Sequence, residues 1–201
     1  MAMTLAPKPP TLPRPPAAGP TPWLWTVDEF NSIGELGVFE GRRAMLVHGI
    51  ILEQGPMNPP HAIAIELVDA AVGQSFGIGW RVRIQLPLIL GQHIDPEPDV
   101  AIVAGSPRDS KLHPTTASLV IEVSDSTLHY DTTTKVDLYA AAAIPEYWVL
   151  DLNARTLRVY RDPGPDGAGD STYRTQTSLT STDSVTPLAS SSSIAVADLL
   201  P

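Results

Sequence analysis

The sequence predicts an α+β domain in which a helix, three strands, a second helix and a further strand follow one another. Three observations predict this order. Residues 61–74 carry apolar side chains at three- and four-residue spacing, which is typical of an amphipathic helix. Residues 99–103 and 119–123 are nearly continuous runs of apolar and β-branched residues, as in strands that are covered on both faces. Residues 131–142 are rich in alanine, which favours a helix.

Length and composition restrict the class of protein. A chain of 201 residues with 43% hydrophobic and 17% charged residues has the composition of a soluble globular protein with one core. The chain contains no cysteine, which excludes disulfides, thiolate zinc sites and cysteine nucleophiles. Its net charge of −9 argues against non-specific coating of DNA, although a local basic groove is compatible with that charge. We expect no membrane segment and no signal peptide, and therefore a cytoplasmic protein.

The first 22 residues contain eight prolines and are predicted to form a flexible tail. Such a segment favours the extended polyproline II conformation and cannot form a packed core. It is either a docking segment for an aromatic groove or a dispensable extension. The folded domain is expected to span residues 23–201.

This domain is predicted to begin with a helix and a hairpin. Thr26 and Glu29 form a capping box, in which each side chain can accept a hydrogen bond from a backbone amide at the start of a helix. Residues 43–53 predict two short strands around His48-Gly49, because glycine readily adopts the positive φ of a tight turn.

The later elements have equally local signals. The sequence Asn58-Pro59-Pro60 is typical of the start of the helix at 61–74, and Pro145 of the end of the helix at 131–142. The other predicted elements are strands at 80–90, 146–152 and 156–161, the last two forming a hairpin, a loop after Pro163, weak strands in the Ser/Thr-rich remainder, and a last turn at 197–200.

Two acidic residues stand in this apolar pattern. Glu122 lies within the strand 119–123, where an unpaired carboxylate in a low dielectric costs several kcal/mol. Asp99 begins the strand before it, directly after Pro98. If the two strands are neighbours, the two carboxylates can converge.

The helix at 131–142 places a lysine on its inward face. At 100° per residue, Asp131, Lys135 and Tyr139 fall on the arc that should face the sheet, whereas Asp137 points away. Helical side chains lean toward the N-terminus, so the ammonium group of Lys135 should reach toward the strand that carries Glu122.

Two carboxylates and a lysine in one site suit a hard divalent cation, Mg²⁺ or Mn²⁺, because closely spaced carboxylates need a counter-ion. Such an ion binds a phosphate oxygen and acidifies water, and a lysine can orient that water, so the set favours phosphodiester hydrolysis. In the competing interpretation, Lys135 only neutralises Asp131 four residues earlier and Glu122 caps a loop.

Several segments match a known family: residues 57–61, 96–100, 119–124 and 144–149, with Asp131, Lys135 and Tyr139-Ala140. In these features the chain resembles the Uma2 family of endonucleases, formerly DUF820, a branch of the PD-(D/E)xK nuclease superfamily. The resemblance extends from about residue 25 to the end of the chain.

The resemblance implies a restriction-endonuclease-like αβββαβ core with a mixed sheet, preceded by the N-terminal helix and hairpin. It also implies that Asp99 and Glu122 bind the metal and that Lys135 is the catalytic lysine. In the superfamily pattern the lysine lies two residues after the acid, where this sequence has Ser124. The family moves the lysine to the following helix, which is the position of Lys135.

Three further residues are weaker candidates for the site. Glu53 ends a strand before the first core helix, and Gln85 alternates with apolar residues beside the first core strand, so either could contact the metal or water. Their ordinary interpretations are a strand-end acid and a polar strand residue. His61 begins a helix and could bind phosphate, or it could have a capping or surface role.

Cations for DNA contact are few. The candidates are Arg42 with Arg43, Arg81 with Arg83 on one strand face, and Arg108 with Lys111 in the loop 105–116, where they would rim the site or lie on a solvated surface.

The leading hypothesis is a Mg²⁺-dependent endodeoxyribonuclease. A second hypothesis keeps the fold as a dimeric nucleic-acid or protein binding module with little turnover. A third is a hydrolase of non-nucleic phosphoesters. Tyr147 and Trp148 are expected to be core residues or to contribute to a homodimer contact rather than to stack on bases.

Overall fold

A mixed sheet of six strands forms the centre of the protein, which is described here from a computed structural model that covers residues 19–201. The strand order is β3-β4-β5-β6-β7-β8, with β5 and β6 parallel and every other neighbouring pair antiparallel. The strands are β3 (Trp80–Ile84), β4 (Val100–Ala104), β5 (Leu119–Ser124), β6 (Glu146–Asp151), β7 (Thr156–Pro165) and β8 (Ser171–Thr180).

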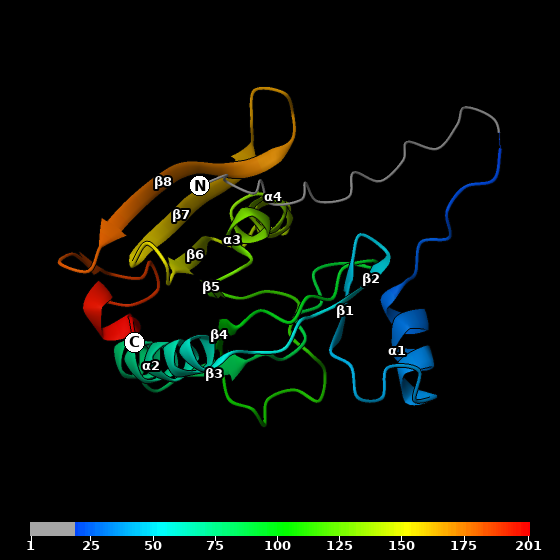
Figure 1. The fold of residues 1–201 in the computed structure, drawn as a ribbon, viewed down its shortest axis with the longest axis horizontal. Helices are drawn as coiled ribbons and strands as arrows, with labels where there is room; N and C mark the ends of the chain where they lie inside the picture. Colours follow the sequence, from blue (N-terminus) through cyan, green and yellow to red (C-terminus); the bar gives the residue numbers. More distant parts are fainter. Residues whose placement is uncertain (1–18) are drawn as a thin grey trace, which may run out of the picture.

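Helices cover both faces of this sheet (Figure 1). Helix α2 (Pro59–Phe76) packs on one face, and the short helices α3 (Leu128–Asp131) and α4 (Thr134–Ala141) pack on the other. Strand β8 also packs against α4, because the far end of the sheet curls toward that helix. The order α2, β3, β4, β5, α4, β6 confirms the predicted succession of helix, three strands, helix and strand.

Alternation along the strands divides the core in two. In β4, Val100 and Ile102 belong to the α2 side, and Ala101 and Val103 to the α4 side. In β5, the same alternation places Glu122 on the α4 side with Val120. The candidate site therefore lies between the sheet and the helices α3 and α4.

Tyr147 and Trp148 are fully buried, as predicted for core residues. Their side chains enter opposite halves of the core, Trp148 the α2 half and Tyr147 the α4 half. The Tyr147 ring stacks on Tyr160 and Tyr173 and lies 4.9 Å, centroid to centroid, from Tyr139.

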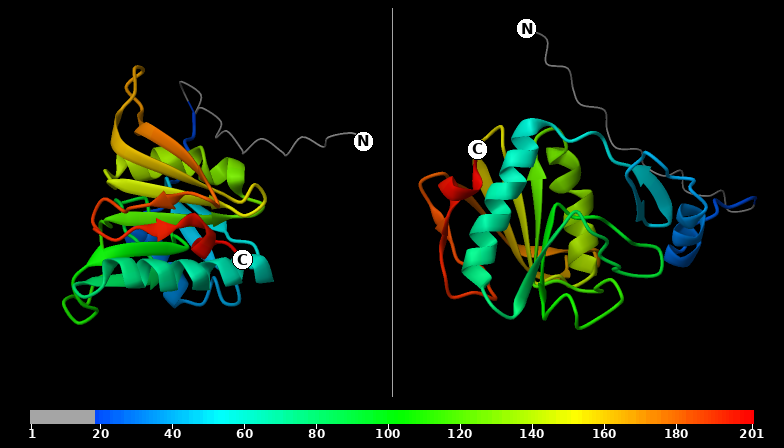
Figure 2. Two further views of the ribbon diagram at one scale, coloured as in Figure 1. Left: turned by 90° about the vertical axis from the view of Figure 1, so that its left-hand side faces the viewer. Right: turned by 90° about the horizontal axis from the view of Figure 1, so that it is seen from below.

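The predicted N-terminal helix and hairpin are confirmed. Helix α1 (Val27–Glu35) begins with the expected capping box. Strands β1 (Ala44–Val47) and β2 (Ile50–Glu53) are joined by His48 and Gly49, which both have positive φ. A Cβ atom at Gly49 would lie only 2.7 Å from the Leu24 Cβ, so the turn requires glycine there. Two further views show α1 and this hairpin beside the central sheet (Figure 2).

Three predicted boundaries are wrong. The helix expected at 131–142 is two helices, because the chain departs from helical geometry at Thr132 and Thr133. The strand expected at 80–90 ends at Ile84, where the following residue, Gln85, takes a positive φ. The loop expected after Pro163 is shorter than predicted, because β7 continues to Pro165 and pairs with the ten-residue strand β8.

The C-terminal segment closes the α2 side of the core. Strands β9 (Ser184–Val185) and β10 (Ile194–Ala195) pair with each other, and the 3₁₀ helix η1 (Val196–Leu199) packs on α2, near the predicted last turn. Most of the predicted tail, residues 1–22, lies outside the described residues. Among residues 19–201, none of the helices has the length and apolar character needed to cross a membrane.

Candidate active site

Asp99 and Glu122 face each other, Asp99 from the residue just before β4 and Glu122 from the neighbouring strand β5. Strands β4 and β5 are antiparallel with Val100 opposite Ile121, which places Asp99, just before β4, opposite Glu122. Glu122 Oε2 lies 3.4 Å from the Asp99 backbone nitrogen, and the Val123 amide donates a 2.8 Å hydrogen bond to Asp99 Oδ2. The structure thus brings the two predicted carboxylates together.

Glu122 is almost fully buried and is held by two donors from α4. Its side chain is 3% exposed; Lys135 Nζ lies 2.8 Å from Oε2, and the Tyr139 hydroxyl donates a 2.7 Å hydrogen bond to Oε1. Burial raises the pKa of Glu122 to about 7, and the negative charges of Asp99 and Asp131 add to that effect while Lys135 opposes it.

Lys135 bridges two carboxylates. Besides Glu122, its ammonium group contacts Asp131 Oδ1 at 3.0 Å, and Asp131 is only 1% exposed. Burial would lower the pKa of Lys135, but the charges of Glu122, Asp131 and Asp99 outweigh burial and raise this pKa above its ordinary value. The expected ion pair with Asp131 is therefore present together with the expected reach toward Glu122.

Asp131 has more contacts in the site than the ion pair with Lys135 that the sequence predicts. Its other oxygen, Oδ2, accepts hydrogen bonds from Ser124 Oγ at 3.0 Å and from Thr127 Oγ1 at 2.5 Å. Ser124 lies two residues after Glu122 on β5, and its hydroxyl orients the carboxylate that contacts Lys135. The inward face of the helical segment indicated Asp131, but its bonds to the sheet and to Thr127 depend on the tertiary structure.

His61 and Gln85 both contact Asp99. His61 Nε2 lies 3.1 Å from Asp99 Oδ1, and Gln85 Nε2 donates to the same oxygen at 3.1 Å. Burial lowers the pKa of His61, but the hydrogen bond and charge of Asp99 outweigh burial and raise this pKa overall. Burial raises the pKa of Asp99, and His61 more than reverses that effect, so the Asp99 pKa lies below its usual range.

The position of His61 follows from the start of α2. Asn58 caps this helix by accepting a 3.0 Å hydrogen bond from the His61 amide, and the Asn58 side chain also contacts Asp125 after β5. His61 therefore has neither a capping nor a surface role: its ring is directed at Asp99 in the first turn of the helix.

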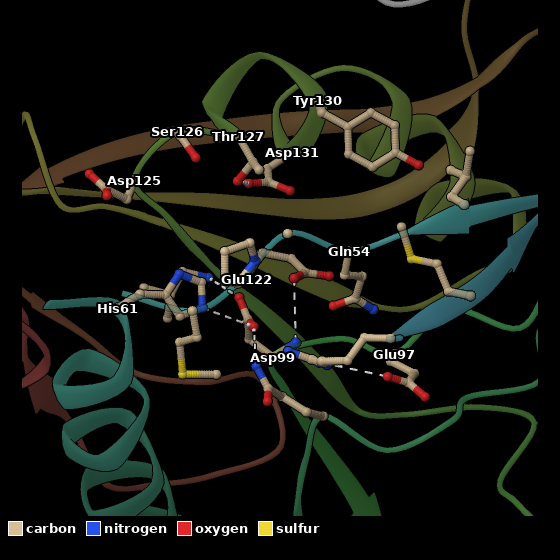
Figure 3. Close-up of a pocket in the computed structure, with 18 of the residues that line it drawn as sticks. Gln54, His61, Glu97, Asp99, Glu122, Asp125, Ser126, Thr127, Tyr130 and Asp131 are labelled. Atoms are coloured by element: carbon tan, nitrogen blue, oxygen red, sulfur yellow. Dashed lines mark hydrogen bonds and ion pairs between the residues drawn. The ribbon is translucent and has the colours of Figure 1, made fainter. Parts of the chain in front are cut away.

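A pocket of about 360 Å³ opens beside these residues. Figure 3 shows His61, Asp99 and Glu122 converging at the pocket, with Asp131 and Tyr130 on another wall. The Tyr130 hydroxyl is buried without a hydrogen-bond partner, and Lys135 Nζ lies 5.7 Å from the centroid of its ring.

The hairpin β1-β2 supplies one side of the pocket. Glu53 lies there, 61% exposed, and its carboxylate contacts Arg42 at 3.7 Å. Arg43 contacts Glu97 at 3.6 Å on the same side. Glu53 is thus a pocket residue without a contact to Asp99, Glu122 or Lys135. Arg108 and Lys111 do not line the pocket and are exposed, which agrees with the second of the two interpretations, a solvated surface.

The side chains that could hold a metal ion at this pocket are the carboxylates of Asp99 and Glu122. In the described part of the chain, no group of three or more His, Asp or Glu side chains is arranged to hold one. Two carboxylates are compatible with Mg²⁺, which keeps several of its water molecules and binds through one or two carboxylates together with substrate phosphates.

The comparisons with known proteins agree with this fold. A family model described as "Putative restriction endonuclease", Uma2, matches residues 27–197. A crystal structure of "a putative nuclease belonging to DUF820" from Anabaena variabilis ATCC 29413 superposes with a TM-score of 0.62 at 17% sequence identity, and the alignment covers 87% of this chain and 96% of that chain. No curated protein sequence matches significantly. Because the family model spans most of the chain, including the two facing carboxylates and the helix with Lys135, the chain belongs to the Uma2 family.

Proposed function

We propose that this protein is a divalent-metal-dependent endonuclease that hydrolyses phosphodiester bonds of DNA. The observation that carries the proposal is the meeting of Asp99, Glu122 and Lys135, from three separate segments of the chain, at one pocket. Membership of the Uma2 family supports the reaction class, and the geometry supports the residues.

The charges of the site favour a cation. Asp99, Glu122 and Asp131 lie within one small region, and Lys135 is the fixed positive charge among them. The donor atoms of Asp99 and Glu122 are hard carboxylate oxygens, which suit Mg²⁺ or Mn²⁺. A divalent ion there would offset the remaining negative charge, polarise a phosphate oxygen and acidify a water molecule.

The other residues have distinct roles in this proposal. Lys135 hydrogen-bonds the attacking water or neutralises the charge that develops on the phosphoryl oxygens, because its ammonium group reaches the pocket between the two carboxylates. Tyr139 and Asp131 position Glu122 and Lys135. His61 and Gln85 fix the orientation of Asp99 through its Oδ1 atom.

The test is nicking of supercoiled plasmid DNA with Mg²⁺ or Mn²⁺ by wild type, Glu122→Gln and Glu53→Ala. Glu122→Gln keeps the size of the side chain but removes the charge, and we expect it to lower nicking by at least about 100-fold. Glu53→Ala is the matched control, since it removes an acid from the same pocket without touching the other candidates. Thermal unfolding verifies that both variants fold.

Nicking by folded Glu122→Gln at the wild-type rate would contradict the assignment. Cleavage of a small phosphodiester with no cleavage of DNA would favour the hydrolase of non-nucleic phosphoesters, and DNA binding without turnover would favour the binding module. Homodimer formation stays a prediction, which sedimentation equilibrium of the full chain tests.

A further inference from the structure

Four cations without an acidic partner gather at one edge of the sheet. They are Arg81 and Arg83 on β3 and Arg108 and Lys111 in the loop that follows β4, which we call together the basic edge. Elsewhere among residues 19–201, every lysine and arginine except Arg155 lies within 4.0 Å of a carboxylate. Arg155, in the β6-β7 turn, donates to the Pro201 carbonyl instead.

Arg81 and Arg83 are unusual because they are half-buried and carry the same charge. The Nε atoms of both side chains are buried without a hydrogen-bond partner. Arg83 Nη2 donates a 2.9 Å hydrogen bond to the Pro87 carbonyl. Burial, together with the charge of Arg81, lowers the pKa of Arg83. Partly desolvated like charges are unfavourable without a counter-charge, so this arrangement favours an anion bound from outside.

The basic edge is continuous with the candidate active site. Trp80, Val82 and Ile84 pack on the α2 side of the sheet, which places Arg81 and Arg83 on the other face, where Asp99 and Glu122 also lie. Gln85, the next residue of the chain after β3, lines the pocket and donates to Asp99. Alternate residues on a strand are about 6.6 Å apart, so the two arginines lead away from the pocket in even steps.

The loop extends this edge at the end of β4 away from Asp99. It begins at Gly105, whose amide donates to the Gly79 carbonyl just before β3. Its later part returns to Arg83, where His113 Nδ1 lies 3.5 Å from Arg83 Nη2. Arg108 and Lys111 are exposed between these two points. The carboxylate of Asp109, in the same loop, accepts a hydrogen bond from the Ser106 amide.

We propose that the basic edge is the track along which the phosphodiester backbone of a nucleic acid lies as it enters the pocket. The inference rests on the proposed function for the identity of the scissile bond, but the track itself is a binding surface. It also explains how a chain with a net charge of −9 and several carboxylates in its pocket retains a polyanionic substrate: cations that form no internal ion pair are concentrated beside the site.

The test measures binding without turnover. Fluorescence anisotropy with a labelled DNA duplex in EDTA, over a series of NaCl concentrations, gives the affinity and its salt dependence. The variant is Arg108→Gln with Lys111→Gln, because both side chains are exposed and belong to the basic edge. The matched control is Arg155→Gln with Arg174→Gln, which removes the same charge from exposed positions elsewhere.

We expect the basic-edge double variant to bind about tenfold more weakly at low salt, and its plot of log K against log salt to be less steep by about 2, one unit for each phosphate that is no longer neutralised. The control should keep the wild-type affinity and slope. Arg83→Gln should weaken binding further, and duplex RNA and single-stranded DNA in the same assay identify which backbone is preferred.

The outcomes separate this inference from the proposed function. Cleavage of a small phosphodiester, which cannot span the track, should be unchanged in the basic-edge variant. If that variant binds and nicks DNA like wild type, the track is wrong although the nuclease assignment stands. If it loses binding while wild type binds nucleic acid without cleaving it, the track stands and the nuclease assignment fails. If wild type binds no nucleic acid, the track is overturned.

Discussion

The Tyr139 hydroxyl and the Lys135 ammonium group hold the two oxygens of Glu122 separately, Tyr139 at 2.7 Å from Oε1 and Lys135 at 2.8 Å from Oε2. Lys135 and Tyr139 lie one turn apart on α4. This helix therefore fixes the orientation of the Glu122 carboxylate plane. Tyr139 is fully buried and its hydroxyl donates to Glu122, which makes it a positioning residue rather than a group that meets substrate.

Tyr139→Phe removes one of these two donors and leaves Glu122 Oε1 buried. We expect the free energy of unfolding to fall by about 1–2 kcal/mol and the nicking rate to fall about tenfold or more, because groups that orient a metal-binding carboxylate affect metal affinity and activity. Urea denaturation measures the free energy of unfolding, plasmid nicking measures the rate, and calorimetric titration with Mn²⁺ measures the metal affinity.

Tyr173→Phe is the matched control for this change. The Tyr173 hydroxyl is also buried and donates a 2.8 Å hydrogen bond to the Ile144 carbonyl, away from the carboxylates. This variant should lose comparable stability and keep the nicking rate. Equal nicking rates for Tyr139→Phe and Tyr173→Phe would mean that Tyr139 has only a structural role.

Lys135→Met leaves Glu122 and Asp131 buried without their cation. Loss of one partner from such a buried ion pair costs about 3–5 kcal/mol, so we expect a large loss of stability at pH 8 in EDTA. The loss should be smaller at pH 5. Burial already raises the pKa of Glu122 to about 7, and removal of the lysine raises it further, so Glu122 is protonated in the folded variant at pH 5.

Urea denaturation at the two pH values measures this dependence, and Lys135→Arg, which keeps the charge, should be much less affected at pH 8. A destabilisation of Lys135→Met that does not depend on pH would contradict the assignment of the buried charges. Neither result involves turnover, so the prediction tests the electrostatics of the site independently of its chemistry.

The sequence predicted the positions of Asp99, Glu122 and Lys135 because their signals are local. An acid in an apolar strand is unfavourable wherever the strand is buried, and the direction of a helical side chain follows from helix geometry. The contacts of His61 and Gln85 with Asp99 join elements that are distant in the chain, and neither has a periodicity that would indicate them.

A buried acid in a strand is not by itself a functional signal. Glu146, the first residue of β6, is completely buried, yet it accepts hydrogen bonds from Arg161, Trp148 and the Leu188 amide and lies outside the pocket. Sequence alone does not separate this structural carboxylate from Glu122. The difference is tertiary: Arg161 satisfies Glu146 across a strand pair, whereas Glu122 shares its lysine with another carboxylate beside a pocket.

Exposed polar strands carry weaker sequence signals than buried strands do. Strand β8 exposes most of its side chains, and Gly and Pro near the end of β7 suggested a loop. Pairing with β7 supplies the backbone hydrogen bonds, and Tyr173 fixes the register by packing among the core tyrosines opposite Pro163. Such a strand depends on its neighbour more than on its own pattern.

His61→Gln tests the charge of the histidine beside Asp99. Because the pKa of His61 is raised in the folded protein, protonation favours folding: the stabilisation is complete below the ordinary value of 6.5 and is lost as the pH rises through the folded-state value. We expect His61→Gln in EDTA to be less stable than wild type by about 1 kcal/mol at pH 6, and the difference to shrink by pH 9.

Thermal unfolding across this pH range measures the effect. His129→Gln is the control, because His129 is exposed on α3 and, among the described residues, makes no side-chain ion pair within 4.0 Å. A His61→Gln deficit that grows with pH would mean that the neutral imidazole, rather than the imidazolium, is the form that contacts Asp99.

Asp95→Asn should stabilise the protein at high pH. Asp95 is 4% exposed, its Oδ1 atom has no hydrogen-bond partner, and burial together with Glu97 raises its pKa from 3.8 to about 6. The unfolded chain loses the Asp95 proton more readily than the folded protein, so stability falls as the pH rises from about 4 to about 6 and stays lower above that. Asparagine removes this loss, and we expect a gain on the order of 2 kcal/mol at pH 8 and none at pH 4.

The control is Asp69→Asn on the exposed side of α2, which should change stability little at either pH. The backbone pairing of Asp95 with Leu46 is retained in both variants, so a loss of stability in Asp95→Asn at pH 8 would show that the carboxylate is stabilised by a partner in the fold.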